Sequence, residues 1–118
     1  MLFHLNYHYE KMREIIFENQ ITQYCISRIS YIEILSGASE NAKKDTRKFL
    51  QQFSIVEFDK ESVKISINLS MKYRIDAKQS KDFLIAATCI ANKIPILTEN
   101  NKHYNYKGLK ILPYRINS

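Results

Sequence analysis

The stretch that decides the fold runs from Ser80 to Tyr104 and reads Ser-Lys-Asp-Phe-Leu-Ile-Ala-Ala-Thr-Cys-Ile-Ala-Asn-Lys-Ile-Pro-Ile-Leu-Thr-Glu-Asn-Asn-Lys-His-Tyr. Its first half predicts a helix that is buried on most sides, capped by Ser80 and with Asp82 in its first turn, where a negative charge suits the helix dipole. The apolar run over residues 94–98 predicts a buried strand. Sites of open α/β sheets form where strands end, so the polar residues that follow mark a candidate site.

Upstream and downstream of this stretch, helices and strands alternate. Apolar periodicity predicts helices over residues 9–19 and 41–53, and one that starts at Ser30 and ends near Gly37. Asp59 is expected to cap a further helix, in which Val63, Ile67 and Met71 recur at i, i+4 and i+8. Short apolar runs predict strands over residues 23–27, 55–58 and 110–112. The alternation indicates an α/β domain.

Size and composition limit the function classes. The 118 residues suit a single domain spanning 1–118, and the net charge of +6 favours an acidic partner such as RNA, although a solvated basic surface is an equal alternative. No run of eighteen apolar residues occurs, which argues against a membrane span. Cys25 and Cys89 are far apart in apolar surroundings and are expected to be buried free thiols in a reducing cytoplasm.

The stretch from Ser80 resembles the PIN-domain ribonucleases, and within them the VapC-type toxins of toxin–antitoxin pairs. The resemblance rests on the order and spacing of short motifs, which are Asp82, Ile85-Ala86-Ala87, Leu97-Thr98-Glu99-Asn100 and Lys102-His103-Tyr104. A second match covers residues 26–38, where Glu33 stands at the position of the family's second acidic ligand. The resemblance implies a three-layer α/β/α fold with a mostly parallel sheet.

The resemblance also implies a function, which is metal-dependent cleavage of RNA in the cytoplasm by a homodimer that pairs with a cognate antitoxin. Glu33 and Asp82 are then expected to bind Mg²⁺ or Mn²⁺, since these ions prefer hard oxygen ligands. Asn100 is expected to orient a water or act as a neutral outer ligand. Thr98 is expected to hold a carboxylate in place.

Two groups of residues have competing interpretations. Lys78 and Lys81 flank Asp82 and are expected to contact RNA phosphates, whereas a solvated loop is the simpler interpretation. Ser30-Tyr31-Ile32-Glu33 fits a capping box, in which the Glu33 carboxylate bonds to the Ser30 amide. The downstream acid Asp82 favours the metal-ligand interpretation of Glu33.

One part of the family pattern is absent. The family begins with an apolar strand that ends in Asp-Thr-Asn, and its Asp is the central metal ligand, whereas the first acid here is Glu10. We interpret residues 1–5 as those that follow this strand, so we expect the first strand to be missing and an apolar strand ending in an acid to be encoded upstream of Met1. Nuclease activity is then impaired, and the alternative is a degenerate PIN-like module that binds RNA or antitoxin without cutting.

Overall fold

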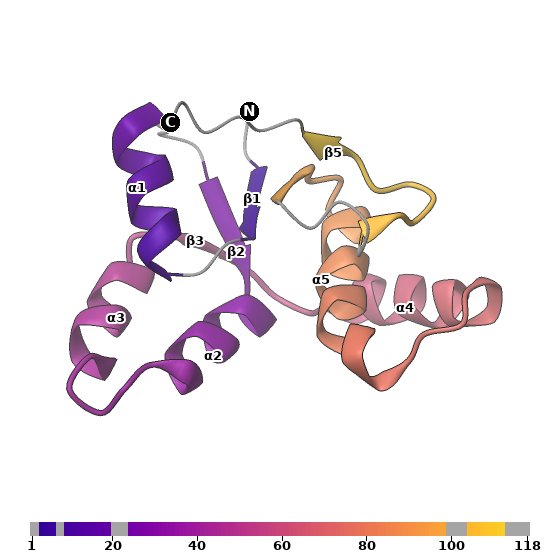
Figure 1. Ribbon diagram of the computed structural model, residues 1–118. Coiled ribbons are helices and arrows are strands. Elements are labelled where there is room, and N and C mark those ends of the chain that lie inside the picture. The colour runs from indigo at the N-terminus through magenta and orange to yellow at the C-terminus, as the bar shows by residue number, and fades with distance from the viewer. Residues whose placement is uncertain (1–2, 7–8, 20–23, 99–103, 113–118) are drawn as a thin grey trace.

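A computed structural model describes residues 3–6, 9–19, 24–98 and 104–112, and Figure 1 shows the arrangement of its elements. In chain order the elements are β1 (Phe3–Asn6), α1 (Tyr9–Asn19), β2 (Tyr24–Ser27), α2 (Arg28–Gly37), α3 (Lys43–Leu50), β3 (Ser54–Val56), α4 (Lys60–Lys72), the 3₁₀ turn η1 (Ala77–Gln79), α5 (Ser80–Ala91), β4 (Ile96–Thr98) and β5 (Ile111–Leu112). Strands and helices alternate as the sequence predicts.

The five strands form one parallel sheet in the order β3-β2-β1-β4-β5. β1 pairs with β2 on one side and with β4 on the other, where the register runs from His4–Ile96 to Asn6–Thr98. Parallel neighbours need crossover connections, and helices supply them between β1 and β2, between β2 and β3 and between β3 and β4.

Helices cover both faces of this sheet, with α1 and α3 on one side and α4 and α5 on the other (Figure 1). Neighbouring residues of β4 show the two layers, because successive side chains of a strand point to opposite faces. Leu97 packs with Met12 and Ile15 of α1, whereas Ile96 packs with α5. The predicted three-layer α/β/α architecture is confirmed.

The centre of the sheet differs from our expectation that the first strand is missing. Phe3–Asn6, which we placed after that strand, itself forms β1 and lies between β2 and β4. The neighbouring strands β2 and β4 are therefore both paired with β1. What the sequence lacks at this point is an acidic residue, because β1 ends in Asn6.

The strand β1 contains a buried histidine, His4, and a polar residue in so short an apolar run does not predict such burial. Its side chain is 1% exposed, and the Nε2 atom accepts a hydrogen bond from the Ser27 backbone N–H at 2.9 Å. Burial lowers the pKa of His4 to about 3, so the ring is neutral near pH 7. Among the residues that the structure describes, the Nδ1 atom has no hydrogen-bond partner.

Helix starts depart from two predicted caps. α2 begins at Arg28 with Ser27 as its cap, whose side chain accepts from the Ser30 N–H, so Ser30 lies inside the helix. α5 begins at Ser80 without a side-chain cap, because Asp76 already caps the preceding turn η1. The predicted cap at Asp59 is confirmed, and its hydrogen bonds from Ser62 lower the pKa of the carboxyl group.

Helix α4 exposes apolar side chains, and helix α5 is followed by a residue in the left-handed conformation. The apolar stripe of α4, formed by Val63, Ile67 and Met71, is exposed, with Met71 84% exposed. α5 ends in a Schellman motif, in which the N–H groups of Lys93 and Ile94 bond to the carbonyl oxygens of Ile90 and Cys89. Lys93 adopts φ 55°, a left-handed conformation that favours glycine.

Both cysteines are buried free thiols, as predicted. Burial raises the pKa of the Cys25 thiol to about 11 and raises the pKa of Cys89 further. Across the described ranges, none of the helices is both long and apolar enough to cross a lipid bilayer.

Candidate active site

The connections of the sheet diverge at its two central strands. From β1 the chain passes through α1 to β2 on one side, and from β4 it passes to β5 on the other. Such a topological switch point leaves a crevice at the carboxyl ends of the strands, where ligands bind. Asn6 and Thr98 pair at this end. α2 starts directly after β2 and α5 runs back before β4, so both helix N-termini lie at the same edge.

Asp82 lies in the first turn of α5 and is half-buried. The hydroxyl group of Tyr104 donates a hydrogen bond to its Oδ1 atom at 2.8 Å. A carboxylate in the first turn is stabilised by the positive end of the helix dipole. The fold therefore places a carboxylate at the switch point and holds it from one side.

Glu33 lies on α2, the helix that contacts α5. The Nζ atom of Lys81 lies 3.3 Å from its Oε2 atom, and both side chains are exposed. Since Lys81 precedes Asp82 directly, this ion pair brings Glu33 to the first turn of α5. The capping-box interpretation of Glu33 is wrong, because Ser27 provides the cap and Ser30 is not at the helix start.

Three of the remaining predicted site residues, Thr98, Lys78 and Lys81, lie within the residues that the structure describes. Thr98 ends β4 at the carboxyl edge of the sheet and is 4% exposed, so its side chain is buried there. Asn100 lies outside the described residues. Lys78 belongs to η1 and is exposed, as is Lys81, so both cations reach solvent beside Asp82.

One lysine of the basic helix α3, Lys43, forms hydrogen bonds within the molecule. The Nζ atom of Lys43 donates to the carbonyl oxygens of Ala38 at 3.0 Å and Leu35 at 3.3 Å, at the C-terminal end of α2. Cations stabilise the negative end of a helix dipole. Lys43 is therefore engaged within the molecule, whereas Lys44, Arg47 and Lys48 are exposed.

Sequence reasoning missed the role of Tyr104. The residue was recognised as the aromatic member of a motif, but its hydrogen bond to Asp82 joins positions 22 residues apart. Neither periodicity nor spacing predicts such a contact. The sequence offered no signal for it, because Tyr104 stands in a polar stretch and its ring is buried only by packing against other elements.

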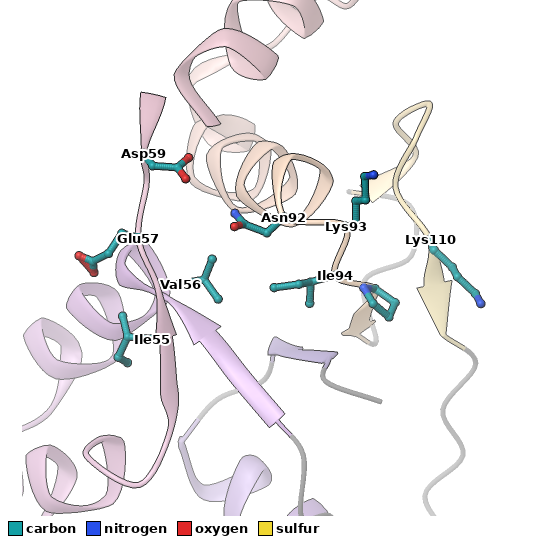
Figure 2. A pocket seen from close by; sticks show the side chains of 9 residues that line it. Ile55, Val56, Glu57, Asp59, Asn92, Lys93, Ile94 and Lys110 are labelled. Atoms are coloured by element: carbon teal, nitrogen blue, oxygen red, sulfur yellow. The ribbon is translucent and has the colours of Figure 1, made fainter. Parts of the chain in front are cut away.

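A pocket of about 720 Å³ lies apart from these residues, and Figure 2 shows the side chains that line it. Val56 and Ile94 point toward one another across it, with Asp59 on one side and Lys93 and Lys110 on the other. Asp59 is already used as the cap of α4. The pocket contains none of the predicted site residues.

The family model described as PIN domain matches residues 6–109. This range is most of the chain and contains Glu33, Asp82, Thr98 and Tyr104. The chain belongs to the PIN-domain family. The match begins at Asn6, the last residue of the central strand β1.

Solved structures share this PIN fold along nearly the whole chain. A toxin–antitoxin complex from Klebsiella pneumoniae is 22% identical, with 97% of this chain and 99% of that chain covered and a TM-score of 0.70. VapBC2 from Rickettsia felis, bound to a promoter DNA fragment, is 17% identical, with coverages of 98% and 100% and a TM-score of 0.70. VapBC-1 from nontypeable Haemophilus influenzae is 16% identical, with coverages of 95% and 97% and a TM-score of 0.74. None of the curated proteins compared with the chain matches it.

This PIN domain departs from the family pattern at β1. The family's first strand ends in Asp-Thr-Asn, whereas β1 is followed by Tyr7-His8 after Asn6. An amide has the size of the carboxylate but carries no charge. β1 therefore ends in an uncharged residue, Asn6, where the family pattern has an acid.

The described donors fit a weakly held Mg²⁺ ion. In proteins Mg²⁺ often takes one or two carboxylates and completes its octahedron with waters and phosphate oxygens. Glu33 and Asp82 supply two, each held by a neighbouring side chain. Within the described parts of the chain no group of three or more His, Cys, Asp or Glu side chains could hold a metal. Any such ion thus depends on few protein ligands.

Proposed function

We propose that this chain is a cytoplasmic metal-dependent endoribonuclease of the toxin–antitoxin type, with reduced activity. The single observation that carries the proposal is that, in a PIN fold, Glu33 of α2 forms an ion pair with Lys81, the residue directly before Asp82 in the first turn of α5. The solved toxin–antitoxin complexes with the same fold support the toxin class. The basic balance of the chain, with a net charge of +6, suits an RNA substrate.

The residues have separable roles in this proposal. Glu33 and Asp82 would hold Mg²⁺ or Mn²⁺, which when bound activates a water and stabilises charge on the phosphate in the transition state. Thr98 and Asn100 support the ligands from the strand end. Lys78 and Lys81 attract RNA phosphates and place the backbone at the crevice.

Reduced nuclease activity follows from the residue at the end of the central strand β1, which is an asparagine and not an acid. Mg²⁺ gives up its waters reluctantly, so each lost carboxylate weakens the site considerably. Asn6 removes a negative charge at the position where β1 and β4 meet. The same observation favours the second candidate function, a PIN module that binds RNA or an antitoxin without cutting.

Cleavage assays on an RNA panel test the proposal. Wild type should cleave weakly with Mg²⁺ or Mn²⁺, and Asp82→Asn, Glu33→Gln and chelation should each abolish cleavage. Asp59→Asn is the matched control, because its carboxylate caps α4 outside the site. Asn6→Asp should raise cleavage by restoring the central charge.

The outcomes of these assays separate the candidates. Full cleavage by Asp82→Asn would reject the assignment of the site. RNA binding without cleavage, by wild type and by Asn6→Asp alike, would establish the binding module.

We propose that an apolar antitoxin segment occupies a groove of about 950 Å³ between α1 and α3. Phe17 is 85% exposed at this groove, and Ile16 and Phe49 line it and pack against the core. Its rim has both charge signs, with cations at Arg13 and Lys48 and carboxylates at Glu14 and Asp45. A concave apolar groove with charged rims suits an amphipathic segment of a partner. Phe17→Glu should abolish capture of the antitoxin.

We propose that the apolar stripe of α4 packs against a second copy. A helix face that meets its own copy about a two-fold axis must be self-complementary. Antiparallel packing of two α4 helices brings Glu61 in the first turn of one toward Lys72 in the last turn of the other. Ile67→Glu should convert the dimer to a monomer in light scattering, whereas a monomeric wild type would refute the dimer.

A further inference from the structure

We propose that Tyr104 is a positioning residue, which fixes the Asp82 carboxylate in the orientation from which Asp82 binds the divalent ion. The proposal rests on the metal site described under the proposed function. It goes beyond that site because Tyr104 would act through Asp82.

The ring of Tyr104 is held by the core. It is fully buried, in one cluster with Ile85, Ala86 and Cys89 of α5 and with Ile96 of β4. The three α5 residues follow Asp82 at i+3, i+4 and i+7, so they lie on the same helix face as the carboxylate. The ring therefore lies along this face of α5, with its hydroxyl end at Asp82.

The hydrogen bond itself is short and directional. The Tyr104 hydroxyl group donates to Oδ1 of Asp82 at 2.8 Å, in the range of hydrogen bonds to carboxylates. A tyrosine side chain has few rotatable bonds, so a packed ring leaves its hydroxyl little freedom. One oxygen of Asp82 is thus fixed by a rigid group, which restricts rotation of the half-buried carboxylate.

Loss of the hydroxyl group should weaken metal binding more than it weakens the fold. Groups that orient metal ligands typically change metal affinity or activity about 10- to 100-fold when they are removed. Tyr104→Phe keeps the ring, so the packing against Ile85, Ala86 and Cys89 stays intact. A purely structural hydroxyl would lower the melting temperature and leave the metal affinity unchanged.

The test is a Mn²⁺ titration of the full chain, in which the electron paramagnetic resonance signal of free Mn²⁺ reports binding without any need for cleavage. Tyr104→Phe should raise the Kd for Mn²⁺ at least about 10-fold. Tyr73→Phe is the matched control, since its hydroxyl accepts a hydrogen bond from the Lys107 N–H and not from a site residue. Its Kd should equal that of wild type.

Equal Mn²⁺ affinity of wild type and Tyr104→Phe would overturn this inference and leave the proposed metal site standing. An equal loss of affinity in Tyr104→Phe and Tyr73→Phe would also overturn it, because the effect would then come from general loosening. Absence of Mn²⁺ binding by wild type would overturn the metal site and this inference together.

Discussion

Acidification from pH 7 to pH 5 should destabilise the folded chain through His4. Burial lowers the pKa of His4 from 6.5 to about 3 in the folded state, so between these values the unfolded chain binds a proton that the folded chain does not. The stabilising contribution is therefore fully present above pH 6.5 and is lost as the pH falls. Each pKa unit corresponds to about 1.4 kcal/mol, which gives a loss of about 2 kcal/mol at pH 5.

Urea unfolding at pH 7, 6 and 5 measures this loss, provided that the transition is two-state. His4→Gln is the comparison variant, because its amide oxygen can accept the Ser27 N–H in place of Nε2 but does not titrate. All other groups titrate in both proteins, so the difference between the two pH profiles isolates His4. Parallel profiles for wild type and His4→Gln would refute the reasoning that His4 is buried in its neutral form.

Three further predictions follow from the packing and the charges. Lys93→Gly should stabilise the fold by about 0.5–1 kcal/mol in urea unfolding, because φ 55° costs a lysine more than a glycine. Leu50→Ala, which empties a fully buried position, should cost about 2–5 kcal/mol, whereas Met71→Ala on the exposed stripe should change the unfolding free energy of the monomer by less than about 0.5 kcal/mol. Lys78→Ala with Lys81→Ala should weaken RNA binding and flatten its salt dependence, and an unchanged salt slope in filter binding would show that these lysines touch no phosphate.

Elements with strong local signals were predicted well from the sequence. The helix over residues 9–19 has the predicted bounds, because Met12 and Ile15 repeat at helical spacing and both are fully buried. The helix that contains Asp82 was likewise predicted from its apolar run. These signals come from the burial of one helix face, which leaves a pattern within a short window.

The central strand could not be predicted in the same way. β1 has four residues with a histidine among them, and a histidine ordinarily marks a polar position. Its burial depends on the Ser27 amide, which comes from another strand 23 residues away. The prediction that Ser80 caps α5 was also wrong. Asp76 accepts hydrogen bonds from the backbone N–H groups of Lys78 and Gln79 just before the helix. A contact between separate strands decided the first case, and a local cap just before the helix decided the second.

The candidate site was predicted in part. The resemblance to the PIN family assigned Glu33 and Asp82 to one site, and the structure brings α2 and α5 together at the Lys81 ion pair. Asn100 stays a prediction. The hydrogen bond from Tyr104 to Asp82 could not be predicted from the sequence, because it depends on the tertiary packing of Tyr104 against the start of α5.

The pairing of β1 with β4 also has a consequence for synthesis on the ribosome. It joins Asn6 to Thr98, two strand ends that are translated far apart in time. Parallel pairing over such a distance carries a large loop-closure cost and forms slowly. A nascent fragment that lacks β4 therefore lacks the strand that pairs with β1 on one side. If the chain is the ribonuclease proposed above, a ribosome-bound fragment without β4 should therefore not cleave RNA.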